Sequence, residues 1–271
     1  MLMRSLLFAP ANRHDLLAKF PAVGADCYAP DLEDGTPAAE RETARATLAA
    51  GVAAARGSRS ESRIFVRVNS ADTADFAHDL AAVRHASVDG VVLPKAESAA
   101  DVEAIGSGLP VIAGIESVRG VVESLAIARA PNVVAVYFGA EDFAADIGGR
   151  RTPDGLEVLY ARSQVVLAAK AAGVKALDQV VINIRDDEAF RRDARMARDL
   201  GYDGKMCLLP RQVPLAHEAF APSAAEIDHA RRLIAAYEEA TARGAGTIDF
   251  EGRMVDPPIL KAAQAIVRAA G

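Results

Sequence analysis

The feature that most constrains the fold of this chain is a repeated alternation of short apolar runs with longer, Ala-rich amphipathic stretches. Such alternation is typical of strands buried in a parallel sheet and of the helices that cover it. Eight runs have the character of buried strands: Arg4–Pro10, Cys27–Asp34, Ile64–Asn69, Gly90–Lys95, Val111–Glu116, Val133–Ala140, Val180–Ile184 and Lys205–Pro210. Eight βα units, with no glycine-rich dinucleotide motif after the first run, predict an α/β protein with a closed (β/α)₈ TIM barrel.

The segment that begins at Ser223 departs from this repeat. We expect a long charged helix to about Arg243, then the Gly-rich stretch GAGTIDFEGRM, and a last helix from about Pro258. No low-complexity linker divides the chain. The sequence therefore predicts a TIM-barrel catalytic domain over residues 1–222 and a C-terminal helical extension over residues 223–271, packed on the barrel or on a neighbouring subunit.

Charge and composition limit the classes of partner. The net charge of −6 offers no overall basic surface for nucleic acid or for an anionic membrane, so a small-molecule ligand is expected. The first apolar run is interrupted by Pro10 and by charges, and no later run is long enough to span a membrane. Cys27 and Cys207 are too few for a disulfide framework and lack the spacing of zinc ligands, which favours a cytoplasmic protein with packing cysteines.

Polar residues follow nearly every predicted strand. In a TIM barrel the active site lies at the carboxyl ends of the strands, so these residues are the candidates for function. They are Asp31, Glu33 and Asp34 in the second run, Arg67 and Asn69 in the third, Lys95 and Glu97 with the fourth, Glu116 in the fifth, Glu141 and Asp142 after the sixth, and Asn183 in the seventh.

A divalent metal would explain why several carboxylates converge on one end of the barrel, since like charges repel one another in a low dielectric. Oxygen ligands without a nearby His or Cys suit Mg²⁺, with Mn²⁺ as an alternative. Glu116 and Asp142 end adjacent strands and are the expected metal ligands. The competing interpretation is that each carboxylate caps the helix that follows it.

Arg67 is the basic residue best placed among these carboxylates. A guanidinium there can bind a substrate carboxylate in a bidentate manner or stabilise an enolate oxygen. The competing interpretation is a salt bridge from Arg67 to Glu33 or Asp34. Asp34 and Lys95, at the ends of the second and fourth predicted strands, are expected to line the substrate site.

The chain resembles the citrate lyase β-subunit and malyl-CoA/citramalyl-CoA lyase group of the HpcH/HpaI aldolase superfamily over essentially its whole length. The resemblance rests on several motifs in one order: RSLLFAPANR, DLEDG, VRVN, LPKAE, GIES, FGAEDF, YARSQVVLAAKAAG, GYDGKMC and FEGRMVDPP. It implies a Mg²⁺-dependent barrel that cleaves a 3-hydroxyacyl-CoA thioester, such as citramalyl-, malyl- or citryl-CoA, into an acyl-CoA and a 2-keto acid, or forms it.

The resemblance also implies roles for particular residues. Glu116 and Asp142 match the family's metal ligands, and Arg67 matches the arginine that contacts the reacting oxygens. Asp256, in the C-terminal motif, matches an acid/base group that enters a neighbouring subunit's site, which implies a homo-oligomer, a trimer or a hexamer. Glu33 is expected to assist proton transfer or to position water.

Two basic residues near the start of the chain, Arg13 and Lys19, match positions that approach the coenzyme A phosphates in the family. Solvated helix charges are the competing interpretation. One departure concerns the thioester pocket: many relatives have His where this chain has Leu209, after the last strand.

Four functions are compatible with the resemblance: a stand-alone acyl-CoA lyase, a citrate lyase β subunit acting on a carrier-bound citryl thioester, a Mg²⁺-dependent aldolase acting on free keto acids, and a catalytically silent binding barrel. The C-terminal FEGRMVDPP motif favours the stand-alone lyase, because a carrier-dependent subunit requires partner chains.

Overall fold

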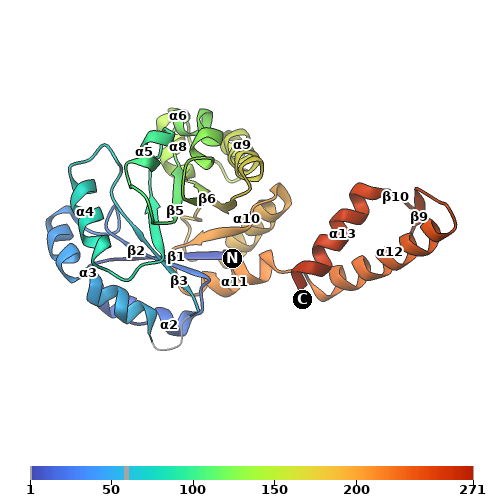
Figure 1. Ribbon diagram of the computed structural model, residues 1–271, viewed down its shortest axis with the longest axis horizontal. Helices are drawn as coiled ribbons and strands as arrows, with labels where there is room; N and C mark the ends of the chain where they lie inside the picture. The colour runs from blue at the N-terminus through green and yellow to red at the C-terminus, as the bar shows by residue number, and fades with distance from the viewer. Residues whose placement is uncertain (1, 58–60, 271) are drawn as a thin grey trace. The chain divides into compact units, whose positions relative to one another are not determined.

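The strands of the N-terminal part form a closed barrel in a computed structural model that describes residues 2–57 and 61–270. All eight barrel strands are parallel and neighbour one another in chain order, and β8 returns to pair with β1. Figure 1 shows strands at the centre of this part of the chain with helices around them. The strands are β1 (Ser5–Pro10), β2 (Cys27–Asp31), β3 (Arg63–Arg67), β4 (Gly90–Leu93), β5 (Val111–Ile115), β6 (Val133–Phe138), β7 (Lys175–Asp178) and β8 (Gly204–Cys207). The predicted (β/α)₈ TIM barrel is confirmed.

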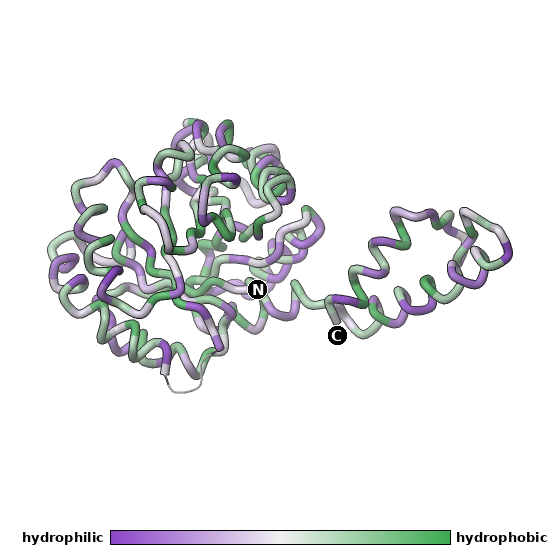
Figure 2. Tube along the Cα trace, in the orientation of Figure 1, coloured by the Kyte–Doolittle hydropathy of each residue, from purple (hydrophilic) through white to green (hydrophobic). Residues whose placement is uncertain are grey.

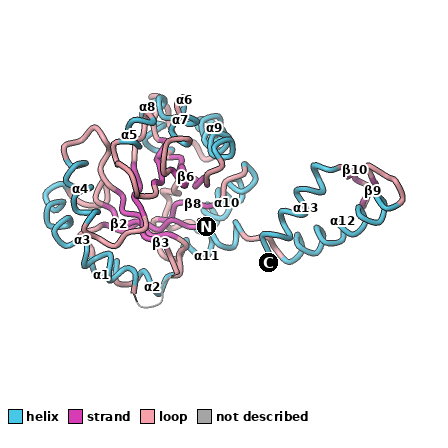
Figure 3. The backbone as a smooth tube through the Cα atoms, viewed as in Figure 1, coloured by secondary structure: helices cyan, strands magenta, loops and turns pink. Residues whose placement is uncertain are grey.

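Helices surround the barrel strands (Figure 3). They are α1 (His14–Leu17), α2 (Phe20–Val23), the 3₁₀ helix η1 (Ala38–Glu40), α3 (Arg41–Arg56), α4 (Asp75–Arg84), α5 (Ala99–Glu103), α6 (Val118–Val122), α7 (Ser124–Ala128), α8 (Ala140–Asp146), α9 (Leu156–Ala172), α10 (Asp187–Leu200) and α11 (Gln212–Phe220). Helix α9 ends at Gly173, whose φ of 75° lies in the left-handed region that glycine adopts without strain.

The chain forms two compact units, Met1–His217 and Glu218–Gly271. The second unit contains α12 (Ala224–Ala242), an antiparallel hairpin of β9 (Ile248–Phe250) and β10 (Arg253–Val255), and α13 (Pro257–Ala270). Ser223 begins α12 with a capping box, which satisfies backbone groups at the helix start. Leu233, Tyr237 and Val255 are buried in the core of this unit.

The barrel interior is filled by alternate residues of the strands. Strand residues point to opposite faces in turn, so residues two apart share a face. The interior cluster includes Leu6, Cys27, Ala29, Phe65, Val92, Ile112, Ala135, Tyr137, Leu177 and Met206. Hydrophobic residues accordingly gather along the central strands (Figure 2). Both cysteines are buried and free, which confirms that they are packing residues.

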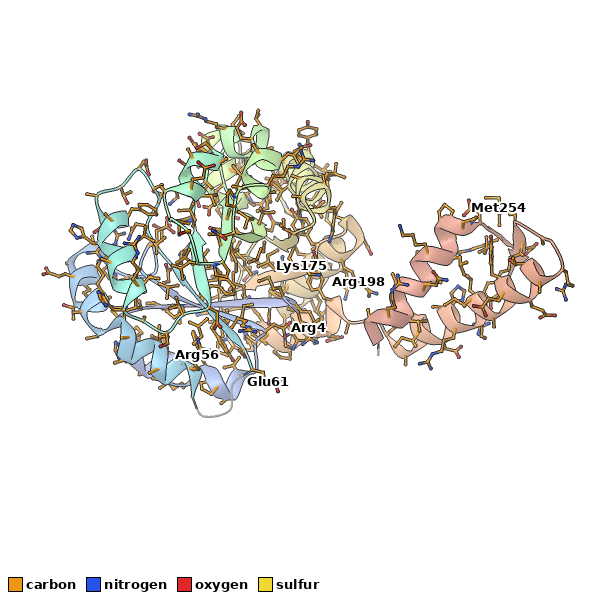
Figure 4. All side chains as sticks on the ribbon, viewed as in Figure 1. Arg4, Arg56, Glu61, Lys175, Arg198 and Met254 are labelled. Atoms are coloured by element: carbon orange, nitrogen blue, oxygen red, sulfur yellow. The ribbon has the colours of Figure 1, made fainter. Side chains whose placement is uncertain are left out.

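The predicted position of the seventh strand, Val180–Ile184, is wrong. The strand is Lys175–Asp178, which begins directly after the helix stop at Gly173 (Lys175 is labelled in Figure 4). Residues 180–184 form a loop, and Ile182 is 63 % exposed. Asn183 therefore lies in this loop and not near the end of a strand.

A buried ionic network accounts for this error. Asp178 accepts hydrogen bonds from Arg162 Nε and Nη2 at 2.8 and 2.7 Å and from Lys205 Nζ at 2.7 Å, and all three residues are at most 1 % exposed. Asp178 and Lys205 are register partners on β7 and β8. Because these charged side chains are fully paired with one another, they can be buried here. The strand therefore contains charged residues, and a search for apolar runs misses it.

Among the residues that the structure describes, no helix combines the length and apolarity needed to cross a membrane.

Candidate active site

Alternate residues of each strand point into the barrel. Near the carboxyl ends of four strands, the residues at these inward positions are polar, and their side chains come together. Four polar residues share the register of the interior core residues. Two positions after such a residue on the same strand come Asp31, Arg67 and Tyr137, and four positions after Ile112 comes Glu116. These positions continue the inward face of β2, β3, β5 and β6. Side chains from four strands therefore converge where the active site of a TIM barrel lies.

Asp31 and Arg67 are register partners on β2 and β3 and form a bidentate ion pair. Arg67 Nε donates to Asp31 Oδ1 at 2.8 Å, and Arg67 Nη2 donates to Asp31 Oδ2 at 2.6 Å. The Arg67 guanidinium also stacks over Phe8, with Cζ 5.0 Å from the ring centroid. Two parallel hydrogen bonds and an aromatic surface fix the plane of this guanidinium.

A tight turn after β2 supports the Asp31 carboxylate. Its two oxygens accept the backbone N–H groups of Glu33 at 2.9 Å and Gly35 at 2.8 Å. A Cβ at position 35 would lie 2.3 Å from Asp31 Oδ2, so only glycine leaves room for this carboxylate. Two residues of the DLEDG motif therefore have structural roles. Its first residue, Asp31, orients Arg67, and its last residue, Gly35, leaves room for the Asp31 carboxylate.

Glu33 links Arg67 to Lys95. Arg67 Nη1 lies 3.0 Å from Glu33 Oε2, and Lys95 Nζ donates to Glu33 Oε1 at 2.6 Å. Burial raises the pKa of Glu33, although the charge of Arg67 and the hydrogen bond from Lys95 oppose it. The predicted competing salt bridge of Arg67 is therefore present with Glu33, while Asp34 is exposed and lies 3.6 Å from Lys95 Nζ.

The backbone of Lys95 adopts a φ of 51°, which non-glycine residues seldom do. Such a conformation costs on the order of 1 kcal/mol and persists only where the surroundings fix it. Burial lowers the pKa of Lys95, but its hydrogen bond to Glu33 and the charges of Glu33, Asp34 and Asp142 outweigh burial and raise it. Lys95 therefore stays protonated beside the carboxylates.

Glu116 is the most deeply buried of the candidate metal ligands. It is 4 % exposed, and its Oε1 accepts a hydrogen bond from the phenol of Tyr137. Burial raises the pKa of Glu116 to about 7; the Tyr137 hydrogen bond opposes the rise, and the charge of Asp142 adds to it. A cation beside Glu116 and Asp142 would relieve this repulsion.

Two glycines make room for the Glu116 side chain. A Cβ at Gly139 would lie 2.6 Å from Glu116 Cγ, and a Cβ at Gly114 would lie 2.4 Å from the Tyr137 hydroxyl and 2.6 Å from Glu116 Oε1. Cβ atoms in proteins essentially never come this close to another heavy atom. The glycines of the GIES and FGAEDF motifs are therefore required by the volume of the carboxylate and phenol that they face.

Asp142 lies in the first turn of α8, a helix of seven residues, and is exposed. Glu116 and Asp142 both line two cavities of about 400 Å³ each. One cavity also contains Arg67 and the apolar side chains of Phe8, Met206 and Leu208. The other contains Lys95, Arg119 and several serine and carboxylate side chains. The two carboxylates thus stand at the wall that both cavities share.

The donor set at this wall fits Mg²⁺. Over the described parts of the chain, no three His, Cys, Asp or Glu side chains come together as a metal cluster. Glu116 and Asp142, which line the same two cavities, would supply two carboxylate ligands. Mg²⁺ is commonly held by one or two carboxylates, with water and substrate completing its octahedron. Burial makes the charged form of Glu116 unfavourable, and a cation at this wall would offset that cost.

Other predicted residues lie elsewhere. Arg13 and Lys19 are exposed around α1, and Arg13 Nη2 pairs with Asp15 at 2.8 Å. Asp256 lies in the second unit, where its carboxylate accepts from Ile259 N at 3.4 Å at the start of α13. Asn69 is buried and donates to the Leu32 carbonyl at 3.1 Å, so it supports the β2 turn.

Tyr137 has a clear role in the geometry but was not singled out from the sequence. Tyr137 was hidden inside the apolar run of β6, where a tyrosine two positions after an interior alanine was the available signal. Asp31 is among the predicted strand-end candidates, with helix capping as the competing interpretation, and in the structure it holds Arg67.

Comparison with known proteins is consistent with this geometry. The family model described as HpcH/HpaI aldolase/citrate lyase matches residues 4–210. The citrate lyase subunit beta-like protein of Deinococcus radiodurans is 45 % identical over an alignment of 279 positions, covering 98 % of this chain and 96 % of that protein. The (3S)-malyl-CoA thioesterase of Cereibacter sphaeroides is 35 % identical over an alignment of 271 positions, covering 98 % of this chain and 94 % of that protein.

Among solved structures, CitE from Mycobacterium tuberculosis in complex with magnesium, acetoacetate and coenzyme A superposes with a TM-score of 0.89 at 38 % identity. The match covers 100 % of this chain and 98 % of that chain. The chain therefore belongs to the HpcH/HpaI aldolase/citrate lyase family.

Proposed function

We propose that the protein is a Mg²⁺-dependent carbon–carbon lyase that cleaves a 3-hydroxyacyl-CoA thioester into an acyl-CoA and a 2-keto acid, or forms it. The observation that carries the proposal is the position of Glu116 and Asp142 at the shared wall of two cavities, one of which also presents Arg67. The CitE relative bound to magnesium, acetoacetate and coenzyme A supports it.

Glu116 and Asp142 would hold the metal. A divalent cation bound there supplies Lewis-acid stabilisation of negative charge on carboxylate and carbonyl oxygens. Tyr137 orients the Glu116 carboxylate through its hydrogen bond, and Gly114 and Gly139 leave room for it.

Arg67 would stabilise the thioester half during cleavage. When the bond between the hydroxyl carbon and the α carbon breaks, its electron pair stays on the α carbon and is delocalised onto the thioester oxygen. Asp31 accepts two of the five guanidinium hydrogens of Arg67, and Nη1 lies 3.0 Å from Glu33 Oε2 without a hydrogen bond, which leaves three hydrogens, on Nη1 and Nη2, for this oxygen. Because the guanidinium is fixed before the charge develops, it costs little reorganisation.

Two protons move in the cleavage. The substrate hydroxyl loses its proton as the keto acid forms, and the α carbon gains one as the acyl-CoA is released. We assign the acid/base role to Asp256 of a neighbouring subunit, by resemblance to the family, and this assignment requires a homo-oligomer. Glu33 would assist by holding Arg67 and Lys95 in place.

The cavity beside Arg67 suits the thioester arm. Phe8, Met206 and Leu208 give it an apolar wall, against which an extended acyl-thioester chain can pack. Arg13 and Lys19 would meet the coenzyme A phosphates by charge attraction. Lys95 and Asp34 would border the substrate near the Glu33 turn.

A thioesterase is the second candidate, because the malyl-CoA relative is named for hydrolysis of the thioester. In that reaction water replaces the coenzyme A thiolate, and no carbon–carbon bond breaks. A carrier-bound citryl thioester and free keto acids are alternative substrates for the lyase reaction.

A product assay distinguishes these functions. The purified protein is incubated with Mg²⁺ and malyl-, citramalyl- or citryl-CoA, and glyoxylate, pyruvate, oxaloacetate, acyl-CoA and free thiol are each quantified. Equal amounts of a keto acid and an acyl-CoA support the lyase, whereas free thiol without keto acid supports the thioesterase. Absence of both products from every substrate, with the fold intact, contradicts the proposal for coenzyme A thioesters.

A further inference from the structure

We infer that Arg151 is a positioning residue for the metal ligand Asp142, acting through the adjacent residue Glu141. The inference rests on the proposed function in one respect, since it takes Asp142 to be a metal ligand. It concerns a residue outside the strand ends, on the loop that joins α8 to α9.

Helix α8 cannot fix Asp142 by itself. It has seven residues, which is too few for an isolated helix to be stable in water. The loop that follows contains Gly148 and Gly149, and Gly148 has a φ of 65°. Glycines enlarge the conformational freedom of such a loop. The position of the first turn of α8 therefore depends on contacts made by its side chains.

Arg151 supplies contacts from three directions. Its Nε donates to Glu141 Oε1 at 2.9 Å, its Nη2 donates to Gln179 Oε1 at 3.1 Å, and its Nη1 donates to Glu157. The Arg151 side chain is 24 % exposed and that of Glu157 is 14 % exposed, so solvent screens these contacts only in part. One guanidinium thus joins α8, the start of α9 and the end of β7.

The far side of this contact is rigid. Gln179 follows β7 and is 3 % exposed, its carbonyl accepts from Lys205 Nζ at 2.7 Å, and its amide donates to Asp193 at 3.2 Å. Lys205 belongs to the buried ionic network with Asp178 and Arg162. Arg151 therefore connects the helix that carries Asp142 to a fully packed part of the barrel.

Loss of Arg151 would act on the metal site in two ways. The first turn of α8 would lose its connection to Gln179 and Glu157. In addition, the Glu141 carboxylate would lose its cation and repel the carboxylate of Asp142, its neighbour in the chain. Groups that orient a metal ligand typically contribute 10–100-fold to metal affinity.

The test is a titration of the metal-free protein with Mn²⁺, in which electron paramagnetic resonance measures the concentration of the free ion. Arg151→Ala is expected to weaken Mn²⁺ binding about tenfold or more, and Arg151→Lys is expected to weaken it as well, because one ammonium cannot make three contacts of this geometry. Arg150→Ala, at the exposed neighbouring position, serves as the matched control and should bind Mn²⁺ as the unaltered protein does.

A double-mutant cycle identifies the route. Glu141→Ala should weaken Mn²⁺ binding, and Arg151→Ala should add little to it in the double variant, since the two residues act through one contact. Unchanged Mn²⁺ affinity in folded Arg151→Lys and Arg151→Ala overturns the inference and leaves the proposed function intact. A fully additive cycle overturns the route through Glu141, and absence of Mn²⁺ binding by the unaltered protein overturns both proposals.

Discussion

The phenol of Tyr137 donates a hydrogen bond to Oε1 of Glu116 inside the carboxyl end of the barrel. Donation to the charged carboxylate opposes the rise in the pKa of Glu116 that burial causes. The hydrogen bond from Tyr137 therefore favours the ionised form of the buried Glu116 carboxylate, which is the form that binds a cation.

Tyr137→Phe should move the pH midpoint of metal binding upward. Without the hydrogen bond, the pKa of Glu116 rises above about 7, so a higher pH is needed to deprotonate the ligand. A hydrogen bond to a charged group contributes about 1.5–3 kcal/mol, which corresponds to a shift of about one pH unit or more. Mn²⁺ titrations between pH 5 and pH 9 measure it, with Tyr202→Phe, whose hydroxyl contacts the Arg162 carbonyl, as the control. An unchanged midpoint would count against the role of Tyr137.

Glu116→Gln should stabilise the metal-free protein at high pH. Because the folded pKa of Glu116 is raised to about 7, its contribution to stability is fully present below the unfolded pKa of about 4.5 and is lost as the pH rises through 7. At about 1.4 kcal/mol per pKa unit, the loss approaches about 3 kcal/mol. Urea unfolding in EDTA at pH 5 and pH 8 should give a larger advantage for Glu116→Gln at pH 8. Equal advantages at both values of pH would be inconsistent with a raised pKa.

Gly139→Ala should weaken metal binding about tenfold or more, because a Cβ placed 2.6 Å from Glu116 Cγ must displace the carboxylate. Gly246→Ala is the matched control, since a Cβ there meets no atom of the described residues within 4 Å. Mn²⁺ affinity and melting temperature are measured for both. Normal affinity in a folded Gly139→Ala protein would show that this glycine does not protect the carboxylate.

Asp178→Ala should destabilise the protein by about 3–5 kcal/mol, since it leaves Arg162 and Lys205 buried without their shared carboxylate. Asp178 lies on β7, away from the cavities that Glu116 and Asp142 line. Urea unfolding of the metal-free protein measures this loss of stability. A small change in the free energy of unfolding would mean that this network contributes little to the fold.

Apolar patterning predicts the barrel but misplaces β7, and the reason is electrostatic. A rule that equates burial with apolarity cannot find a strand in which Asp178 is buried, because its partners Arg162 and Lys205 come from α9 and β8. The pattern predicts the seventh strand at Val180–Ile184 because that segment is apolar, although its Ile182 is exposed in the structure. The family membership and the barrel are confirmed, since neither depends on one strand.

The strand-end residues predicted from the sequence do meet, because parallel strands bring their carboxyl ends to one face. Arg67, Glu116 and Asp142 line one cavity, and Glu33 contacts Arg67. Side-chain pairing could not be read from the pattern: Tyr137 with Glu116, and Arg151 with Glu141, depend on three-dimensional contacts. The catalytic role of Asp256 remains a prediction.

The rate of keto acid release as a function of Mg²⁺ concentration tests the central claim most directly. The assay uses the best thioester substrate, with the protein stripped by EDTA and then reloaded, beside Glu116→Ala and Asp142→Ala. We predict a rate that vanishes on stripping, returns and saturates with added Mg²⁺, and stays at least about 100-fold lower in both variants, since the metal contributes several kcal/mol of charge stabilisation. Release that survives EDTA, or that proceeds at the full rate in Asp142→Ala, would contradict the assignment of Glu116 and Asp142 as the ligands of a catalytic metal.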